Sequence, residues 1–120
     1  MKAPDLKGLI LGYLADAAGV PAVSTRPENG PQRFVRVIAT GGQGRSNRVQ
    51  QHIQLTVDSY NDSPGHAWEL ANTVDAAMYG LPQSDLPVSR VQGNTPAESP
   101  DPGTASARYT ATYQLTTLCL

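Results

Sequence analysis

Residues 34–61 read FVRVIATGGQGRSNRVQQHIQLTVDSYN and hold two runs of strand-forming residues, joined by glycines, polar residues and two arginines. The pattern predicts two antiparallel strands, at residues 33–41 and 48–60, with a connecting loop at 41–48 that is too long for a two-residue turn. The second strand alternates between apolar and polar side chains, which is typical of a strand with one buried face. The stretch therefore predicts a projecting hairpin at the centre of the fold.

A helix is predicted before the hairpin, close to the start of the sequence. Pro4 suits its first turn, and Gly19 suits its end. Its predicted buried stripe has helical spacing and consists of Leu6, Leu9, Ile10, Tyr13, Leu14 and Ala17. Because of this spacing, and because Asp5 and Asp16 flank the apolar run, we expect a helix of the folded protein rather than a signal peptide.

A second helix is predicted after the hairpin. Asp62 or Ser63 can cap its start, Pro64 can occupy its first turn, and Gly80 can end it. Its predicted buried face consists of Ala67, Leu70, Ala71, Val74, Ala77, Met78 and Leu81. Both helices are therefore expected to pack against a sheet through one face.

Three further strands complete the predicted sheet. They lie at residues 20–25, at 86–92 and in the alternating run ARYTATYQLTTLCL at the end, which follows a Pro-, Gly- and Ser-rich loop at 93–104. The resulting order, α-β-β-β-α-β-β, predicts an α+β fold with a mainly antiparallel sheet of four to five strands and two helices packed on one face. Residues 1–120 are expected to form a single domain.

Composition excludes several classes of function. The formal net charge is -1, so no overall field would hold the chain on nucleic acid or on an acidic membrane. No stretch approaches the roughly 18 consecutive apolar residues that a membrane span requires. Cys119 is the only cysteine, which rules out an internal disulfide and fits a reducing compartment.

The sequence contains no recognisable catalytic or metal site. His52 and His66 are the only histidines, lie 14 residues apart and have no nearby ligand partner, so structural positions are expected for both. Ser59 points to the opposite side of its strand from His52 and Asp58, which excludes a triad. The glycines of residues 41–45 lack the GK[ST] ending of a phosphate loop. No cofactor is predicted, and the chain is not expected to be an enzyme.

The outward faces of the two clearest strands are almost free of charge. Their residues are Gln50, His52, Gln54, Thr56, Asp58, Thr110, Thr112, Gln114 and Thr116. The whole chain has two lysines and three glutamates but seven arginines, and protein interfaces are depleted of Lys and Glu and enriched in Arg. The codon bias of a GC-rich genome is a second explanation. We take Gln50, Gln54, Thr56, Thr110, Thr112 and Gln114 as a candidate inter-subunit or channel face.

Two further features have both a functional and a structural interpretation. Arg45 and Arg48, in the predicted loop 41–48, form either a contact with an acidic partner or DNA phosphates, or a solvated hairpin tip. Trp68 is either partly buried packing or an interface anchor. The loop at 93–104 is a second candidate contact segment, because long loops in compact domains are usually functional or disordered.

The chain resembles the tail terminator, or tail completion, proteins of long-tailed bacteriophages that infect actinobacteria. The resemblance covers nearly the whole length. It rests on the order of the elements and on LILGYLADAAGVPAVSTRPEN, RFVRVIATGGQGRSNRVQQHIQLTVDSY, HAWELANTVDAAM and the closing RYTATYQLTTL. These are patterns of spacing and composition without a catalytic signature.

The resemblance implies a tail-terminator-like virion subunit that closes into a homo-oligomeric ring, typically a hexamer. Such a ring ends polymerisation of the tail tube protein and joins the tail to the head-tail connector protein, at the neck of a virion assembled in the host cytoplasm. DNA passes through its channel without specific binding. One alternative is a head-to-tail connector or other neck protein. An alternative of another class is a small ligand-binding or enzymatic α+β domain, with a pocket around Tyr13, Tyr79 and Tyr113.

Overall fold

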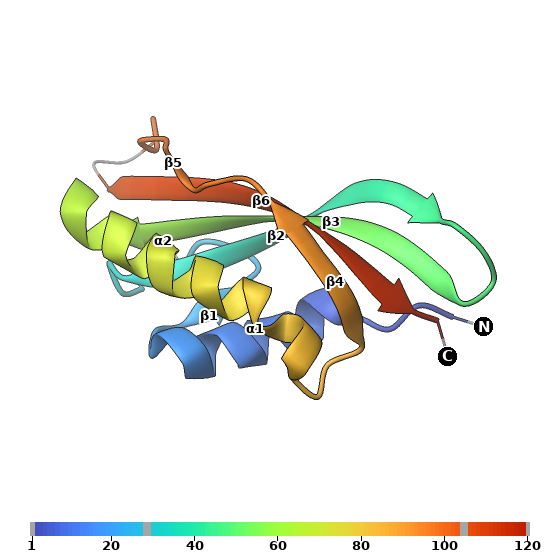
Figure 1. Ribbon diagram of the computed structural model, residues 1–120. Coiled ribbons are helices and arrows are strands. Elements are labelled where there is room, and N and C mark those ends of the chain that lie inside the picture. The colour runs from blue at the N-terminus through green and yellow to red at the C-terminus, as the bar shows by residue number, and fades with distance from the viewer. Residues whose placement is uncertain (1, 28–29, 104–105, 120) are drawn as a thin grey trace.

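The computed structural model describes residues 2–27, 30–103 and 106–119, which form two layers. One layer is a mixed sheet, and the other consists of two helices that cover one face of it (Figure 1). The elements in chain order are α1 (Leu6–Ala18), β1 (Ala22–Val23), β2 (Phe34–Arg45), β3 (Gln50–Asn61), α2 (Pro64–Tyr79), the 3-10 helix η1 (Leu81–Gln83), β4 (Val88–Gly93), β5 (Ala97–Glu98) and β6 (Ala107–Leu118).

The sheet has six strands within the described residues, in the order β1-β2-β3-β6-β4, and β5 pairs with β6. The pair β1–β2 is parallel, and all the other pairs are antiparallel. The predicted α+β class, with two helices and a mainly antiparallel sheet, is therefore confirmed. The sixth strand is β5, which lies in the segment predicted as the loop 93–104. A strand of two residues is too short to show an alternating pattern.

The helices begin and end for local reasons. The Asp5 carboxylate accepts a hydrogen bond from the Gly8 amide at the start of α1, and the Ser63 hydroxyl does the same for the His66 amide of α2. Gly19 ends α1 with a φ of 67°, which glycine adopts without strain. Pro4, predicted in the first turn of this helix, lies just before it, because the capping residue is Asp5 and the helix begins at Leu6.

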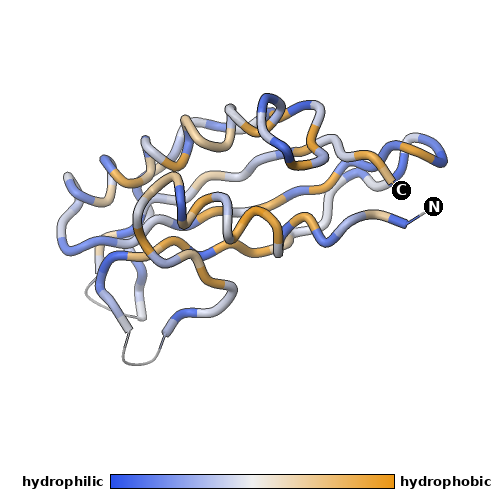
Figure 2. Tube along the Cα trace, turned by 90° about the horizontal axis from the view of Figure 1, so that it is seen from below, coloured by the Kyte–Doolittle hydropathy of each residue, from blue (hydrophilic) through white to orange (hydrophobic). Residues whose placement is uncertain are grey.

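Apolar side chains from both helices and the central strands fill the space between the layers. Figure 2 shows hydrophobic and hydrophilic residues alternating along both helices. The core cluster consists of Leu6, Ile10, Leu14, Val20, Val35, Val37, Leu55, Val57, Leu70, Val74, Met78, Leu81, Val88, Ala111, Tyr113 and Leu115. Leu9 and Ala17, predicted on the buried stripe of α1, are exposed. The stripe that touches the core follows the narrower spacing of Leu6, Ile10 and Leu14.

The hairpin differs most from its prediction. Strand β2 continues through the glycines to Arg45, so the loop predicted at 41–48 is replaced by a short turn at 46–49. Register shifts on both sides of Gly41 mark bulges, and Gly42 has a φ of 123°. A Cβ atom on Gly42 would lie 2.7 Å from the carbonyl oxygen of His52. Glycine therefore lets the strand continue through a twisted, bulged segment.

The extended hairpin gives the molecule its length. Its end passes beyond the helices at one end of a molecule that measures 44 × 26 × 24 Å (Figure 1). From Val37 onward β2 has no partner on its outer side in the described residues, because β1 pairs only with Val35 and Arg36. The hairpin thus carries one free strand edge and an exposed turn away from the core.

Candidate interaction surfaces

The polar side chains of β3 and β6 share the sheet face that the helices leave uncovered. In the antiparallel register Gln54 lies opposite Gln114, and Thr56 lies opposite Thr112. The structure therefore places the predicted residues Gln50, Gln54, Thr56, Thr110, Thr112 and Gln114 on one face, all of them exposed or half-buried. We call the open part of this face the polar face: Thr40, Gln50, His52, Gln54, Thr56, Arg90, Gln92, Thr110, Thr112, Gln114 and Thr116.

Hydrogen bonds between side chains link the polar face across three strands. Gln54 Nε2 donates to Thr40 Oγ1 at 3.1 Å, and the hydroxyls of Thr56 and Thr112 lie 3.2 Å apart. The Thr40 hydroxyl also lies 3.4 Å from that of Thr56. The network holds these groups as a neutral surface that can both donate and accept hydrogen bonds.

Two shallow hollows lie on the polar face. One has a volume of about 180 Å³ and is lined by Gln43, His52, Arg90, Gln92, Gln114 and Thr116. The other has a volume of about 370 Å³ and is lined by Gln92, Gly93, Asn94, Thr112 and Gln114. Arg90 is the only formally charged side chain in either lining. Apart from Arg90, the hollows are therefore lined by groups that can form hydrogen bonds with a neighbour.

The remaining part of the same sheet face carries a cluster of arginines and aromatic rings. The rings of Phe34 and Tyr60 are stacked, with centroids 4.5 Å apart. The guanidinium carbons of Arg26, Arg36 and Arg108 lie 5.1, 5.8 and 5.9 Å from the centroid of the Tyr60 ring. Sequence reasoning missed this cluster, because its members are far apart in the chain and meet only through the strand register.

Carboxylates pair with two of the three arginines of this cluster, whereas Arg108 Nε donates to the Ser99 carbonyl at 2.8 Å. Asp58, expected on the outward polar side, lies there but is only 3% exposed and accepts a hydrogen bond from Arg36 Nη2 at 2.7 Å. Asp101 accepts one from Arg26 Nη1 at 2.7 Å. The backbone amide of Gly103, together with the nearby arginines, lowers the pKa of Asp101. Part of the candidate contact segment 93–104 is thus engaged in covering the sheet of its own chain.

The turn of the hairpin carries the other predicted contact residues. Arg45 Nη1 donates to the backbone carbonyl of Arg48 at 3.2 Å, and both side chains are exposed. The side-chain oxygen of Asn47 accepts from the amides of Val49 and Gln50, which fixes the turn. The structure therefore brings Arg45 and Arg48 together at the tip, although the long loop predicted to carry them is absent.

Helix α2 presents an exposed tryptophan. Trp68 has 51% of its surface exposed, so it is partly buried and still presents a large apolar surface, and both of its interpretations stay open. Nearby, His66 Nδ1 lies 2.6 Å from Asp62 Oδ1 at the start of the helix. This hydrogen bond raises the pKa of His66 and lowers the pKa of Asp62. His66 therefore helps to hold the first turn of α2, as a structural position should.

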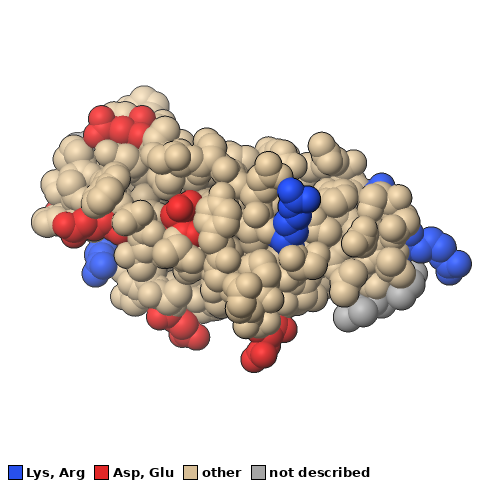
Figure 3. All heavy atoms as spheres, in the orientation of Figure 1, with Lys and Arg blue, Asp and Glu red and all other residues tan. Residues whose placement is uncertain are grey.

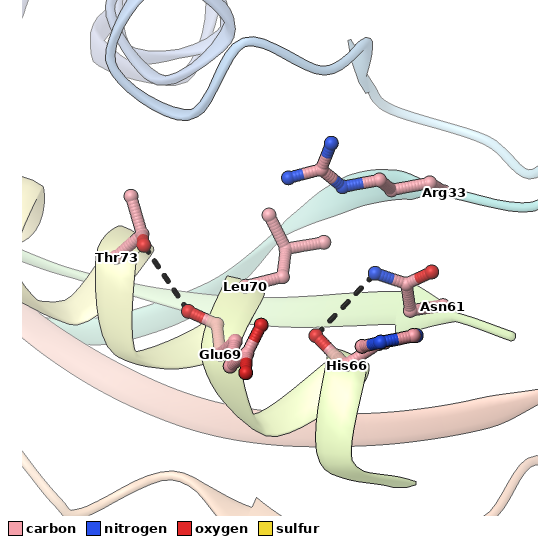
Figure 4. A pocket seen from close by; sticks show the side chains of 6 residues that line it. All are labelled: Arg33, Asn61, His66, Glu69, Leu70 and Thr73. Carbon is pink, nitrogen blue, oxygen red and sulfur yellow. Dashed lines mark hydrogen bonds between the residues drawn. The ribbon is translucent and has the colours of Figure 1, made fainter. Parts of the chain in front are cut away.

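An open pocket of about 390 Å³ lies between the start of β2 and the first turns of α2 (Figure 4). It is lined by Arg33, Asn61, His66, Glu69, Leu70 and Thr73. Asn61 Nδ2 donates to the His66 carbonyl at 3.3 Å, and the Thr73 hydroxyl donates to the Glu69 carbonyl at 3.1 Å. The side chains of Asn61 and Thr73 therefore serve the backbone of α2.

The described residues contain no group of side chains suited to binding a metal ion. No three His, Cys, Asp or Glu side chains of residues 2–27, 30–103 and 106–119 converge on one point. Ser59 is buried and points away from the face that carries His52, as predicted. Every buried side-chain nitrogen or oxygen in this part of the chain has a hydrogen-bond partner. Cys119 is buried and free. None of the described helices is long and apolar enough to span a membrane.

The three tyrosines proposed as an alternative ligand pocket pack against the chain itself. The Tyr13 hydroxyl donates to the Ala77 carbonyl at 2.7 Å, and the Tyr113 hydroxyl donates to Asp75 at 2.6 Å. The rings of Tyr79 and Tyr113 meet edge to face, with centroids 6.2 Å apart. Burial and the hydrogen bond to Asp75 raise the pKa of Tyr113 well above its usual value. The tyrosines thus join α1, α2 and β6 to one another.

Comparison with known proteins gives a match at the level of structure. No family model matches the sequence. No curated protein matches it either. The fold is similar to that of a chain in the virion of a native gene transfer agent (GTA) particle, with a TM-score of 0.62 and 13% sequence identity. The similarity covers 88% of this chain and 84% of that chain. The two chains therefore share a fold along almost their whole lengths.

Proposed function

We propose that this protein is a structural virion protein that forms a ring at the head-proximal end of a phage tail. The ring would end polymerisation of the tail tube, provide the joint to the head connector and leave a central channel for DNA. The observation that carries the proposal is the fold shared with a chain of a GTA virion over 88% of this chain. The sequence resemblance to tail terminators, which rests on separate observations, supports the same role.

The polar face supports a role in assembly rather than in chemistry. A ring subunit needs surfaces that accept a neighbour, and a side chain without formal charge loses little hydration energy when it is covered. If the face instead lines the channel, its threonines and glutamines offer no cluster of positive charge to retain DNA. Either position allows DNA to pass without specific binding. The residues concerned are Gln50, Gln54, Thr56, Thr110, Thr112 and Gln114.

The hairpin turn is the surface we assign to a neighbouring virion protein. Arg45 and Arg48 are exposed at one end of the molecule, away from the core that α1 and α2 cover. The segment 93–104 is the second candidate, although its residues beyond β5 partly cover the sheet. The tail tube protein and the head-tail connector protein are the partners that the proposed position implies.

Electron microscopy tests the proposal directly. The purified protein is imaged alone and after mixing with tail tubes, and we expect rings and a cap at one end of each tube. Rings that bind connector complexes but leave tube ends uncapped would instead favour a connector or other neck protein. A chain that stays monomeric at high concentration, and leaves tubes uncapped, would contradict the proposal. Turnover of a substrate by the isolated subunit would favour the enzymatic alternative.

Charge placed on the polar face should block ring formation. In Thr112→Glu or Gln54→Glu, a carboxylate would have to be covered by a neighbour or crowd the channel, at a cost of several kcal/mol per unpaired buried charge. Both side chains are half-buried in the subunit, so the monomer should still fold. Gln32→Glu adds the same charge at an exposed position just before β2, outside the face, and is the control. Normal rings from both face variants would refute this placement.

A further inference from the structure

An exposed apolar side chain lies at the hairpin turn. Large apolar residues with at least 42% of their surface exposed are, among the described residues, Leu9, Val49, Trp68, Tyr79 and Leu118. Val49 lies at the turn, level with Cys119, whose amide donates to the Val49 carbonyl at 2.8 Å, whereas Leu118 pairs with Gln50 and so points to the opposite face of the sheet. We call Arg45, Arg48 and Val49 the turn patch. It combines two cations with an apolar surface of the kind found in protein interfaces.

Two of the other exposed apolar residues lie on helix α2. Trp68 and Tyr79 are 11 positions apart, or three turns, so they share one side of the helix, about 16 Å from end to end. We call Trp68, Glu69, Asn72, Asp75 and Tyr79 the α2 patch. Asp75 and Tyr79 are hydrogen-bonded to Tyr113 of β6 and to Gly93 of β4, so this side of α2 faces β6 and β4, while Glu69 follows Trp68 around the outer side of the helix toward the pocket that it lines with Arg33.

The two patches carry opposite charges. Residues 33–57 contain four arginines and no acidic residue, whereas residues 59–89 contain four acidic residues and no lysine or arginine. In the view of Figure 3, most acidic side chains lie over the half of the molecule that carries α2, and basic side chains appear at the hairpin end. Charge and apolar surface therefore match between the patches, with cations facing carboxylates and aliphatic groups facing aromatic rings.

A single molecule cannot join its own patches. The turn lies beyond one end of the helical layer, and α2 begins at the opposite end of the molecule (Figure 1). The turn patch can therefore contact only the α2 patch of another molecule. Because the patches differ, such a contact is heterologous, and repeating it generates a ring if the rotation closes.

We propose that the turn patch of one copy docks on the α2 patch of the next copy. This inference rests on the proposed function and takes a second copy of the chain, rather than the tail tube or connector protein, as the neighbouring virion protein that the Arg45 and Arg48 surface contacts. The planar guanidinium groups can stack on the Trp68 ring and pair with Glu69. Trp, Tyr and Arg are the residues most enriched among those that dominate binding energy.

A mixing experiment tests the contact. One variant, Arg45→Glu with Arg48→Glu, removes the turn patch, and another, Trp68→Ala with Glu69→Lys, removes the α2 patch. Each variant alone should remain monomeric in analytical ultracentrifugation, because each should bind itself at least about 30-fold more weakly. Mixed together, the two variants retain one intact pair of patches between them, so they should form a 1:1 dimer and nothing larger.

Controls separate this contact from folding and from other surfaces. Asp16→Lys reverses an exposed charge on α1, and Leu9→Ala removes an exposed apolar side chain on the same helix, both outside the two patches and the polar face. Both should assemble as the parent does, and circular dichroism should show the patch variants folded. A mixture that stays monomeric would overturn the inference.

The proposed function can fail separately from this contact. Rings formed by the patch variants would overturn the contact and leave the ring proposal intact. If the turn variant formed rings but no longer bound tail tubes, the turn would be a contact with the tail tube protein and not with a second copy. A parent chain that neither assembles nor caps tubes would remove the proposed function itself.

Discussion

Three glycines in β2 and α1 let us predict how the fold responds to substitution. Gly42 has a φ of 123°, and a Cβ there would lie 2.7–2.9 Å from backbone atoms of residues 52–54. A strained φ costs roughly 1–3 kcal/mol, and forcing an atom into filled space costs roughly 1–3 kcal/mol more. Gly42→Ala should therefore lower the free energy of unfolding by about 3 kcal/mol.

Two other glycines separate the contributions to this cost. Gly41 has a φ of 95°, but its Cβ would meet nothing within 4 Å, so Gly41→Ala should cost only about 1 kcal/mol. Gly12 lies inside α1 with open space around it, and Gly12→Ala should stabilise the protein by up to about 1 kcal/mol. The expected order of stability is therefore Gly12→Ala, parent, Gly41→Ala and Gly42→Ala.

Urea unfolding followed by far-UV circular dichroism measures these differences, at a protein concentration where the chain is monomeric, because assembly would add to apparent stability. Equal midpoints for Gly41→Ala and Gly42→Ala would refute the argument that the backbone contact at Gly42 adds to the cost of its φ. A parent-like Gly42→Ala would mean that β2 does not follow this bulged path. A destabilised Gly12→Ala would contradict the open surroundings of α1 at that position.

Two further predictions concern ion pairs. Asp58→Ala should lower the free energy of unfolding by about 2 kcal/mol, because it leaves the guanidinium of Arg36, whose side chain is 24% exposed, without its carboxylate. Adding Arg36→Met should restore part of this loss. An unchanged urea midpoint for Asp58→Ala would contradict the pairing. The pKa of His66, measured by NMR titration, should lie above 6.5 and return toward that value in Asp62→Asn. Because folding raises the pKa of His66 and lowers that of Asp62, the pair stabilises α2 between about pH 4 and 6.5. This stabilisation is lost as the pH rises through the pKa of His66 or falls through the pKa of Asp62. If Asp62→Asn left the pKa of His66 unchanged, the bond would be contradicted.

Periodicity and capping chemistry explain why much of the fold could be predicted. Alternation in residues 48–60 and 107–118 marks the two central strands, because one face of each is buried against the helices. Ser63, Pro64 and Gly80 mark the limits of α2 through local chemistry that needs no tertiary context. The same reasoning placed six uncharged residues on one sheet face, because a strand places alternate side chains on opposite faces.

The features that sequence reasoning missed depend on long-range geometry. The glycines of 41–44 look like a loop in sequence, and only their pairing with β3 shows them to be bulges in a strand. The cluster around Tyr60 requires the register that sets Arg36 beside Asp58, and the return of the chain that brings Asp101 to Arg26. The exposure of Trp68 depends on which flank of α2 meets the sheet, which helical spacing alone does not decide.

The distribution of charge over the uncovered sheet face bears on why the polar face is neutral. A GC-rich codon bias favours arginine over lysine but does not remove charge, so it would leave charged residues across the whole face alike. Instead, charged residues gather where the segment beyond β5 covers the sheet, and two of the arginines there are paired, Arg36 with Asp58 and Arg26 with Asp101. Where the chain leaves its own sheet open, uncharged Thr and Gln side chains prevail, with Arg90 in a hollow. The content of charged residues thus differs between the covered and the open part of one sheet face. A bias in composition would affect both parts equally, so this difference favours contact with a neighbour as the reason why the open part is neutral.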